Sequence, residues 1–266
     1  MLVSTIVFFH AHPDDEASAT AGTMVKASRE GHRVVVVYAT NGEHGQAPDP
    51  LPDGVSIAEH RRGEAEASAR VTGTARVVWL GYSDSGMAGW EQNAHEESFH
   101  SADLDEAARR LGDVLDEEDA DVLVSYDWHG GYGHPDHVKV HHVANRALEI
   151  AARRPRLLET SMNRDYMRGL MAAAREAGAS EDEAWDVDAP MGDGNPIGTP
   201  EAELHHRIDV RDVIDVKRAA LQCHASQTTD VGMMLAMPEE HFLLGFGYEH
   251  YIEPGRAPGM VDGWPF

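Results

Sequence analysis

The stretch TIVFFHAHPDDE, residues 5–16, decides the fold of the chain around it. Residues 3–9 form an apolar run rich in β-branched and aromatic side chains, which is typical of a buried strand. Titratable side chains follow at once: His10, His12, Asp14, Asp15 and Glu16. Such a dense polar group at the end of a buried strand indicates a functional site there.

Apolar runs and helical patterns alternate over the first 150 residues or so. The expected strands are residues 3–9, 33–38, 76–80 and 121–125, and the expected helices lie near residues 20–30, 57–71, 104–115 and 136–153. Continuous apolar strands that alternate with helices are the mark of a parallel sheet covered on both faces. The sequence therefore predicts an α/β fold, a Rossmann-like, doubly wound and mostly parallel sheet.

The pattern becomes looser after this core. A strand is expected at residues 157–162, a helix at 164–177, an acidic loop rich in Gly and Pro at 179–200, a strand at 204–210, a helix at 213–223 and a strand or loop pair at 241–255. We expect a single domain over residues 1–266, with the α/β core and the metal site in 1–155 and C-terminal elaborations around the substrate pocket in 156–266.

Composition excludes several classes of protein. Apolar residues make up 42% of the chain without any run near the roughly 18 that a bilayer span needs, so no membrane span is expected. The first residues lack the pattern of a secretion signal, which predicts a cytoplasmic protein. A formal charge of −24 argues against nucleic acid as a partner. Because Cys223 is the only cysteine, any metal must be held by His and carboxylate side chains.

Polar residues gather after four of the expected strands. The segments are HAHPDDE, ATNGEHG, GYSDSGMAG and YDWHGGYGHPDHVKVHH. In an open parallel sheet, ligands bind in the crevice beyond the carboxyl ends of the strands. All four segments are therefore predicted to face one crevice.

Three of these residues suit a metal ion. His12 and Asp15 are three positions apart across a turn that Pro13 stiffens, and His137 opens the helix after the fourth strand. Two His and one carboxylate leave a coordination position open, as a catalytic zinc site requires, and the same trio suits non-haem iron. The donor set is compatible with either metal.

A purely structural role, or a different metal fold, accounts for these residues less well. Asp14 or Asp15 could be an ordinary helix N-cap, but two adjacent Asp beside two His and a second HPDH string make capping alone insufficient. The HxHxDH string of metallo-β-lactamase-type hydrolases needs His where this chain has Asp15. An amidohydrolase barrel needs eight βα units, more than the chain comfortably supplies.

With these residues in view, the chain resembles the PIG-L/LmbE-like family of zinc-dependent deacetylases, and most closely its mycothiol-pathway members. The matching strings are AHPDDE at 11–16, RRGE at 61–64, DSGMAG at 84–89, GGYGHPDH at 130–137 and KRAALQCHASQ at 217–227. The resemblance implies the α/β fold already predicted. It also implies a hydrolase of linear amides that removes an N-acetyl group from an N-acetylglucosaminyl compound.

The resemblance also implies roles for single residues. His12, Asp15 and His137 are similar to the metal ligands, usually of Zn²⁺, although another divalent ion such as Fe²⁺ would fit. The implied chemical groups are the base Asp14, the acid His134 and the mobile Tyr132 that assists the oxyanion. Arg61 and Asp84 match positions that bind the sugar, and Asp136 matches a carboxylate that supports a ligand.

Three alternative functions also fit the sequence. An amidase of mycothiol S-conjugate type differs only in the substrate pocket, and a metal-dependent sugar-binding protein would lack turnover. A non-haem iron oxygenase would consume oxygen with its substrate. A base beside a metal ligand favours hydrolysis over the last two. The expected partner is therefore a small N-acetyl amino-sugar conjugate, whose aglycone the sequence leaves open.

Overall fold

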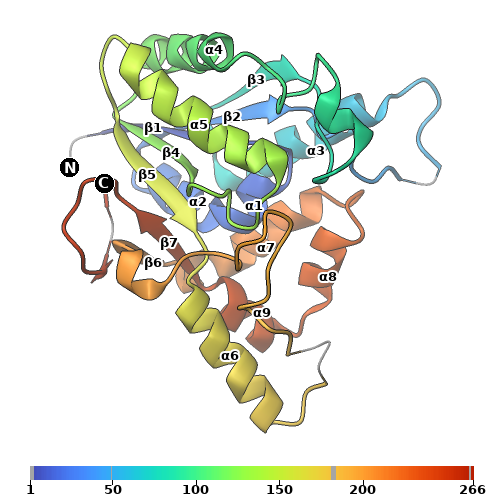
Figure 1. Cartoon of the computed structure of the whole chain (residues 1–266), viewed down its shortest axis with the longest axis vertical. Coiled ribbons are helices and arrows are strands. Elements are labelled where there is room, and N and C mark those ends of the chain that lie inside the picture. The colour runs from blue at the N-terminus through green and yellow to red at the C-terminus, as the bar shows by residue number, and fades with distance from the viewer. Residues whose placement is uncertain (1–2, 49, 181–183, 264) are drawn as a thin grey trace.

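The computed structural model describes residues 3–48, 50–180, 184–263 and 265–266. Its strands form one eight-stranded sheet in the order β3-β2-β1-β4-β5-β7-β6-β8 (Figure 1). The strands are β1 Thr5–His10, β2 Arg33–Thr40, β3 Arg76–Tyr82, β4 Val122–Tyr126, β5 Arg156–Ser161, β6 His206–Asp209, β7 Tyr248–Ile252 and β8 Val261–Asp262. The helices are α1 Asp15–Ala19, α2 Ala21–Arg29, α3 Ile57–Thr72, α4 Leu104–Glu117, α5 Pro135–Ile150, α6 Arg164–Glu176, α7 Ile214–Cys223, α8 Asp230–Ala236 and α9 Glu239–Phe246.

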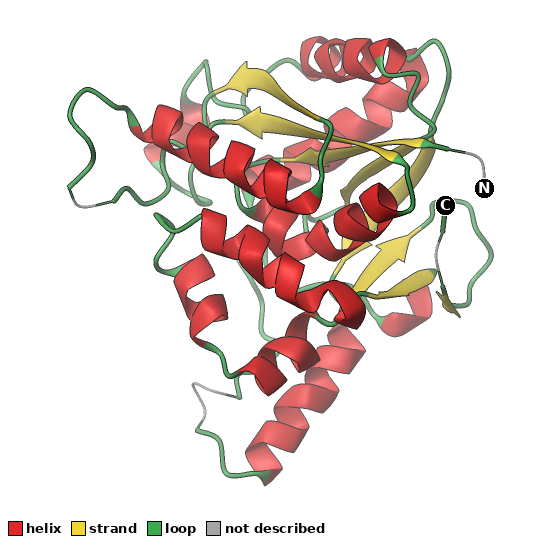
Figure 2. Cartoon of the chain, turned by 180° about the vertical axis from the view of Figure 1, so that it is seen from behind, coloured by secondary structure: helices red, strands yellow, loops and turns green. Residues whose placement is uncertain are grey.

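The first five strands run parallel, which confirms the predicted doubly wound sheet. Alternate residues of β1 enter opposite faces, as the pleat requires. Val7 and Phe9 pack with α4 and α5, whereas Ile6 and Phe8 pack with α2 and the chain before α7. Figure 2, seen from behind, shows helices both in front of and beyond the strands. Helices therefore bury both faces of the central strands, which explains why these strands are unbroken apolar runs.

The second half of the chain extends the same sheet. β7 pairs antiparallel with both β5 and β6, so it reverses the direction of the sheet at this edge. Lys217 on α7 and Glu249 on β7 form a buried ion pair with 2.6 Å between Nζ and Oε1. The same carboxylate accepts the backbone N–H groups of Gly22 and Thr23 at the start of α2. Lys217 therefore anchors α7 to the sheet, and the pair joins segments far apart in sequence.

One predicted element is wrong in its first part and right in its second. The segment expected as a strand or loop pair at 241–255 begins with α9, and only β7 is extended. Phe242 and Phe246 lie one helical turn apart, and their rings stack with centroids 4.7 Å apart. This i, i+4 contact favours a helix that buries Phe242. The short helix α8 was not expected.

The helix after β1 also begins earlier than expected. The sequence pattern placed it at 20–30, but α1 begins at Asp15 and a break at Thr20 separates it from α2. The first turn of a helix therefore follows β1 almost directly. Among the described residues, no helix is both long and apolar enough to cross a bilayer.

Candidate active site

The segments after the parallel strands meet at one end of the sheet, as the sequence predicted. The backbone N–H of Asp84, after β3, donates to Glu43 after β2, and Asp84 accepts the N–H of His44. Asp136, at the start of α5, accepts the backbone N–H of Ser85 at 2.9 Å. Nε2 of His12, in the first segment, lies 3.1 Å from Oδ2 of the same Asp136, so hydrogen bonds join the four segments into one cluster.

Asp15 lies between the two histidines that were predicted to bind metal with it. Its Oδ2 lies 3.3 Å from Nδ1 of His12, and its Oδ1 lies 3.2 Å from Nε2 of His137. The three side chains come from the end of β1, from α1 and from the first turn of α5. The structure therefore brings His12, Asp15 and His137 together, with His12 and His137 buried.

The hydrogen bonds of His137 leave one nitrogen without a partner. Its Nδ1 lies 3.2 Å from the carbonyl oxygen of Gly130, so Nδ1 carries the proton and donates it there. Its Nε2 is buried and has no hydrogen-bond partner among the described residues, although the Asp15 carboxylate is close. A lone pair that faces a carboxylate is repulsive unless a cation lies between them. This orientation fits a metal ligand.

His12 has the same arrangement with a carboxylate behind it. Nε2 of His12 lies 3.1 Å from Oδ2 of Asp136, which is fully buried, and 3.4 Å from Oδ1 of Asp84. A proton on Nε2 leaves the Nδ1 lone pair directed at Asp15. A carboxylate that accepts the second N–H of a ligand histidine fixes the ring and makes it more basic. Asp136 is placed for the supporting role that the resemblance implied.

Besides the trio of His12, Asp15 and His137, two further groups of side chains in the described residues could hold an ion. His12, His134 and His137 each offer a nitrogen within 4.8 Å of the others, and so do ligand atoms of His12, Asp84 and Asp136. The oxygens of Asp84 and Asp136 already accept backbone N–H groups and the Ser85 hydroxyl. The excess of carboxylates around buried histidines favours a cation, and this part of the molecule is a buried His/Asp group able to hold a metal.

Asp14 points elsewhere although it precedes Asp15 directly. Its backbone is left-handed, with φ 106°, and its Oδ2 accepts a hydrogen bond from Arg61 at 2.8 Å. Asp14 occupies the N-cap position of α1, but its side chain makes no capping hydrogen bond. Helix capping therefore does not account for this side chain.

The two carboxyl groups also differ in acidity. Burial raises the pKa of Asp14 to about 6, although Arg61 opposes this rise. Burial would raise the pKa of Asp15 too, but His137 and His12, when they are protonated, lower it well below its usual value. Adjacent acids whose pKa values are driven apart are typical of sites where one accepts protons and the other stays charged.

Tyr132 and His134 come from the glycine-rich loop before α5. Nδ1 of His134 accepts the backbone N–H of Asp136 at 3.1 Å, so the proton of the neutral ring lies on Nε2. Burial, His12 and His137 lower the pKa of His134 to about 2, which makes the ring neutral near pH 7. The Tyr132 ring lies with its centroid 5.0 Å from that of His137. Both side chains thus lie beside the candidate metal ligands.

The acidic segment expected at 179–200 packs against this loop, apart from residues 181–183, which lie outside the described part. The backbone N–H of Gly198 donates to the carbonyl of Gly131 at 2.7 Å. Oδ2 of Asp193 lies 3.4 Å from Nδ1 of His129. A Cβ added to Gly133 would lie 2.6 Å from the Asp193 side chain. The segment therefore forms a wall against the loop that carries Tyr132.

Arg61 and Asp84 lie at the site but have protein partners. Arg61 is buried on α3, and it donates to the carbonyls of Pro13 and Gly42 as well as to Asp14. Asp84 accepts the N–H groups of His44 and Gly86. These hydrogen bonds organise the site itself, and sugar binding by either residue remains a prediction.

Sequence reasoning missed several buried residues around the site. Glu16 is part of the first motif, yet no role was predicted for it; it contacts Ser68 and His224. Asp127 accepts the N–H groups of His129 and Gly131, so it shapes the glycine-rich loop. Both acids follow predicted strands, and this position was the signal that could have identified them.

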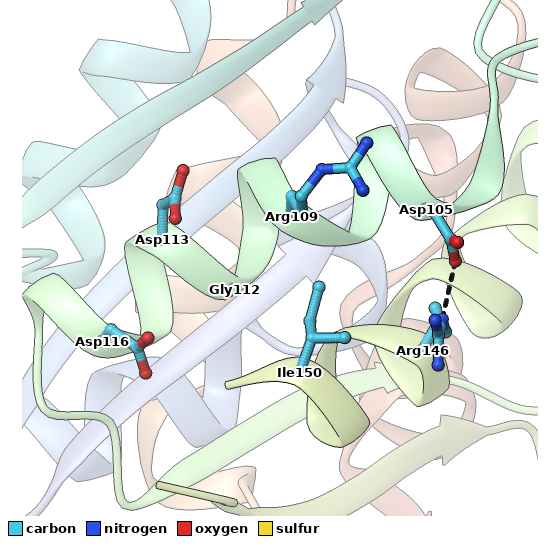
Figure 3. Close-up of a pocket in the computed structure, with 7 residues that line it drawn as sticks. All are labelled: Asp105, Arg109, Gly112, Asp113, Asp116, Arg146 and Ile150. Carbon is cyan, nitrogen blue, oxygen red and sulfur yellow. Dashed lines mark hydrogen bonds and ion pairs between the residues drawn. The ribbon is translucent and has the colours of Figure 1, made fainter. Parts of the chain in front are cut away.

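A separate hollow lies on the outside of the molecule between α4 and α5 (Figure 3). It has a volume of about 270 Å³ and is lined by Asp105, Arg109, Gly112, Asp113, Asp116, Arg146 and Ile150. Its Asp105 and Arg146 already pair with each other at 2.7 Å. None of the candidate site residues lines it, so the chemistry is assigned to the end of the sheet.

Fold and site together define the class: an α/β protein with a buried His/Asp centre at the carboxyl end of a parallel sheet. Residues 7–148 match the family model described as PIG-L: GlcNAc-PI de-N-acetylase. The chain is 37% identical to the 1D-myo-inositol 2-acetamido-2-deoxy-α-D-glucopyranoside deacetylase of Nocardiopsis dassonvillei, over 87% of each chain. The protein belongs to the PIG-L family.

Solved structures share this fold at low identity. N,N'-diacetylchitobiose deacetylase from Pyrococcus horikoshii aligns with a TM-score of 0.59 and 21% identity, over 95% of this chain and 84% of that one. GalB, the 4-carboxy-2-hydroxymuconate hydratase of Pseudomonas putida, aligns with a TM-score of 0.55 and 17% identity, over 96% and 98%. A hydratase and a deacetylase therefore share the fold, so the reaction must be argued from the site.

Proposed function

We propose that this protein is a zinc-dependent N-deacetylase that hydrolyses the acetamide of 1D-myo-inositol 2-acetamido-2-deoxy-α-D-glucopyranoside. The observation that carries the proposal is the divergence of two adjacent carboxylates. Asp15 lies between the histidine nitrogens, whereas Asp14 turns toward Arg61. A metal ligand beside a separate base is what amide hydrolysis needs, and the substrate in the name of the Nocardiopsis relative supports this particular amide.

The proposed ion is held by His12, Asp15 and His137. Nitrogen and carboxylate donors in this number leave an open position, which suits catalytic zinc better than a closed structural site. When bound, zinc supplies a more acidic water and polarises the amide oxygen. The buried lone pair of His137, which has no other partner in the described residues, supports this assignment.

The proposed roles of Asp14, His134 and Tyr132 follow from which of these groups can accept a proton and which carry one. Asp14, whose pKa is raised to about 6, accepts a proton from the attacking water. His134, the predicted acid, is neutral and presents its Nε2–H at the site, and the proton that Asp14 has taken from water passes to the departing nitrogen, so that the amine leaves without an imidazolate being formed. The Tyr132 hydroxyl is proposed to donate a hydrogen bond to the oxyanion. The proposal keeps Arg61 and Asp84 as residues that contact the sugar. Each would then hydrogen-bond to the sugar while keeping its hydrogen bonds to the protein.

The test measures free amine released by zinc-loaded protein from the inositol glycoside and from a mycothiol S-conjugate. We expect release from the inositol glycoside, and a fall of about 10² to 10⁴ in kcat for Asp14→Asn with metal content unchanged. Faster release from the S-conjugate would reassign the protein as an amidase. Binding of the glycoside without release would reject hydrolysis and leave a sugar-binding protein. Parallel loading with Fe²⁺ decides the metal.

A further inference from the structure

Asp14 is held in a conformation that its residue type does not favour. Of the described residues other than glycine, only Asp14 and Asp119 have positive φ. A side chain with Cβ crowds the backbone in this region, so the surroundings must maintain it. The carbonyl of Asp14 accepts the N–H groups of Ala17 and Ser18 in α1. The remaining backbone group of Asp14 is its N–H, and the partner of this N–H is the contact that can maintain the left-handed conformation.

The carboxylate of Glu16 provides that contact. Its Oε2 accepts the backbone N–H of Asp14 at 3.0 Å, and its Oε1 accepts hydrogen bonds from Ser68 at 2.5 Å and from Nε2 of His224 at 2.7 Å. Glu16 is 1% exposed, and both Ser68 and His224 are fully buried. α3 and the end of α7 thus fix the carboxylate from two sides.

We infer that Glu16 is a positioning residue that acts through Asp14. Its fixed carboxylate holds the Asp14 peptide in the left-handed conformation, and this turn directs the base and the ligand Asp15 apart. Arg61 holds the Asp14 side chain, whereas Glu16 holds its backbone. The inference rests on the proposed function for its effect on rate, but its claim about the conformation of Asp14 stands independently.

The alternative is that Glu16 serves only to pack α1 against α3 and α7. Glu64 offers a matched comparison, because it is also a buried carboxylate and accepts the N–H and hydroxyl of Ser226 at 2.8 and 2.7 Å. The carboxylate of Glu64 is thus bound to the chain after α7, and not to the Asp14 peptide. If both acids serve only in packing, replacing either one with Ala should have a similar effect on kcat. If Glu16 positions Asp14, only the replacement of Glu16 should lower kcat strongly.

The experiment combines kinetics with structure. We expect Glu16→Ala to lower kcat on the inositol glycoside by about 10- to 100-fold, with little change in KM and the metal retained, because a small misplacement of a catalytic group is costly. Glu16→Gln keeps an acceptor for the Asp14 N–H and is expected to restore most of the rate. In an Asp14→Asn background, Glu16→Ala should cause no further loss.

A crystal structure of Glu16→Ala gives the second readout, in which the φ of Asp14 should leave the left-handed region. An unchanged Asp14 conformation would overturn the inference whether or not the wild type hydrolyses the glycoside. Equal rate losses for Glu64→Ala and Glu16→Ala, or additive losses with Asp14→Asn, would also overturn it. If Glu16→Ala does not fold, Glu16→Asp replaces it, since its shorter side chain withdraws the carboxylate from the Asp14 N–H.

Discussion

If His12 binds the proposed ion, Asp136 acts on that ion through the His12 ring without touching the ion itself. It is fully buried, accepts Nε2–H of His12 and is itself held by the backbone N–H and hydroxyl of Ser85. Removing its charge should let the His12 ring reorient and make it a weaker ligand. We expect Asp136→Asn to weaken zinc binding by about 10- to 100-fold.

A competition titration with a chromophoric chelator measures this change in zinc affinity. Asp105→Asn, on the outer face of α4, is the control and should leave the affinity unchanged. Wild-type affinity in Asp136→Asn would show that His12 needs no carboxylate to bind metal, or that His12 is not a ligand.

At the scale of the element, the glycine-rich loop determines where α5 begins. Gly130 and Gly131 both have positive φ, but their surroundings differ. A Cβ on Gly130 would lie 2.3 Å from Cβ of His137, whereas a Cβ on Gly131 would lie 3.5 Å from the flexible Met162 side chain. Gly130→Ala must therefore displace His137, and Gly131→Ala need only accept an unfavourable φ, at about 1 to 3 kcal/mol.

We expect Gly130→Ala to lose both metal and activity, and Gly131→Ala to keep its metal with a modestly lower melting temperature. Metal analysis of the two purified proteins, together with thermal unfolding, checks this pair. Full metal content in Gly130→Ala would mean that the start of α5 can move without disturbing the site.

At the scale of the whole molecule, stability should depend on a buried histidine in β7. Burial and the nearby Arg207 lower the pKa of His250 to about 4. In the unfolded chain the pKa of histidine is near 6.5. Between these values the unfolded state binds more protons, so the contribution of His250 is complete above about pH 6.5 and is lost as the pH falls toward 4.

Urea unfolding at several pH values checks this expectation. The wild type should lose roughly 3 kcal/mol more stability than His250→Gln over that range, as an upper value. The exposed His241 gives the matched variant, His241→Gln, which should follow the wild type. If the free energy of unfolding changes with pH by the same amount in the wild type and in His250→Gln, the neutral His250 is excluded as a source of the pH dependence.

The fold was predictable in its first half for a simple reason. Strands buried on both faces are uniformly apolar, and β1, β2 and β4 therefore stand out in the sequence. The edge strand β3 is only partly buried, but its VVWL run is apolar as well. The segment at 241–246 did not, because HFLLGF is equally compatible with a short strand or a short helix. The packing of Phe242 and the contact between Phe242 and Phe246 decide for the helix.

The sequence by itself determined the kind of site: motifs at strand ends must meet in a parallel sheet, and His12, Asp14, Asp15, Asp136 and His137 carry the right chemistry. Only the tertiary structure decided that Asp15 faces the two histidines while the adjacent Asp14 faces Arg61. The left-handed turn at Asp14 depends on Glu16, which Ser68 and His224 hold from distant parts of the chain. Such contacts exist only because α3 and α7 pack beside α1, and the sequence around Glu16 does not specify which distant helices will lie there.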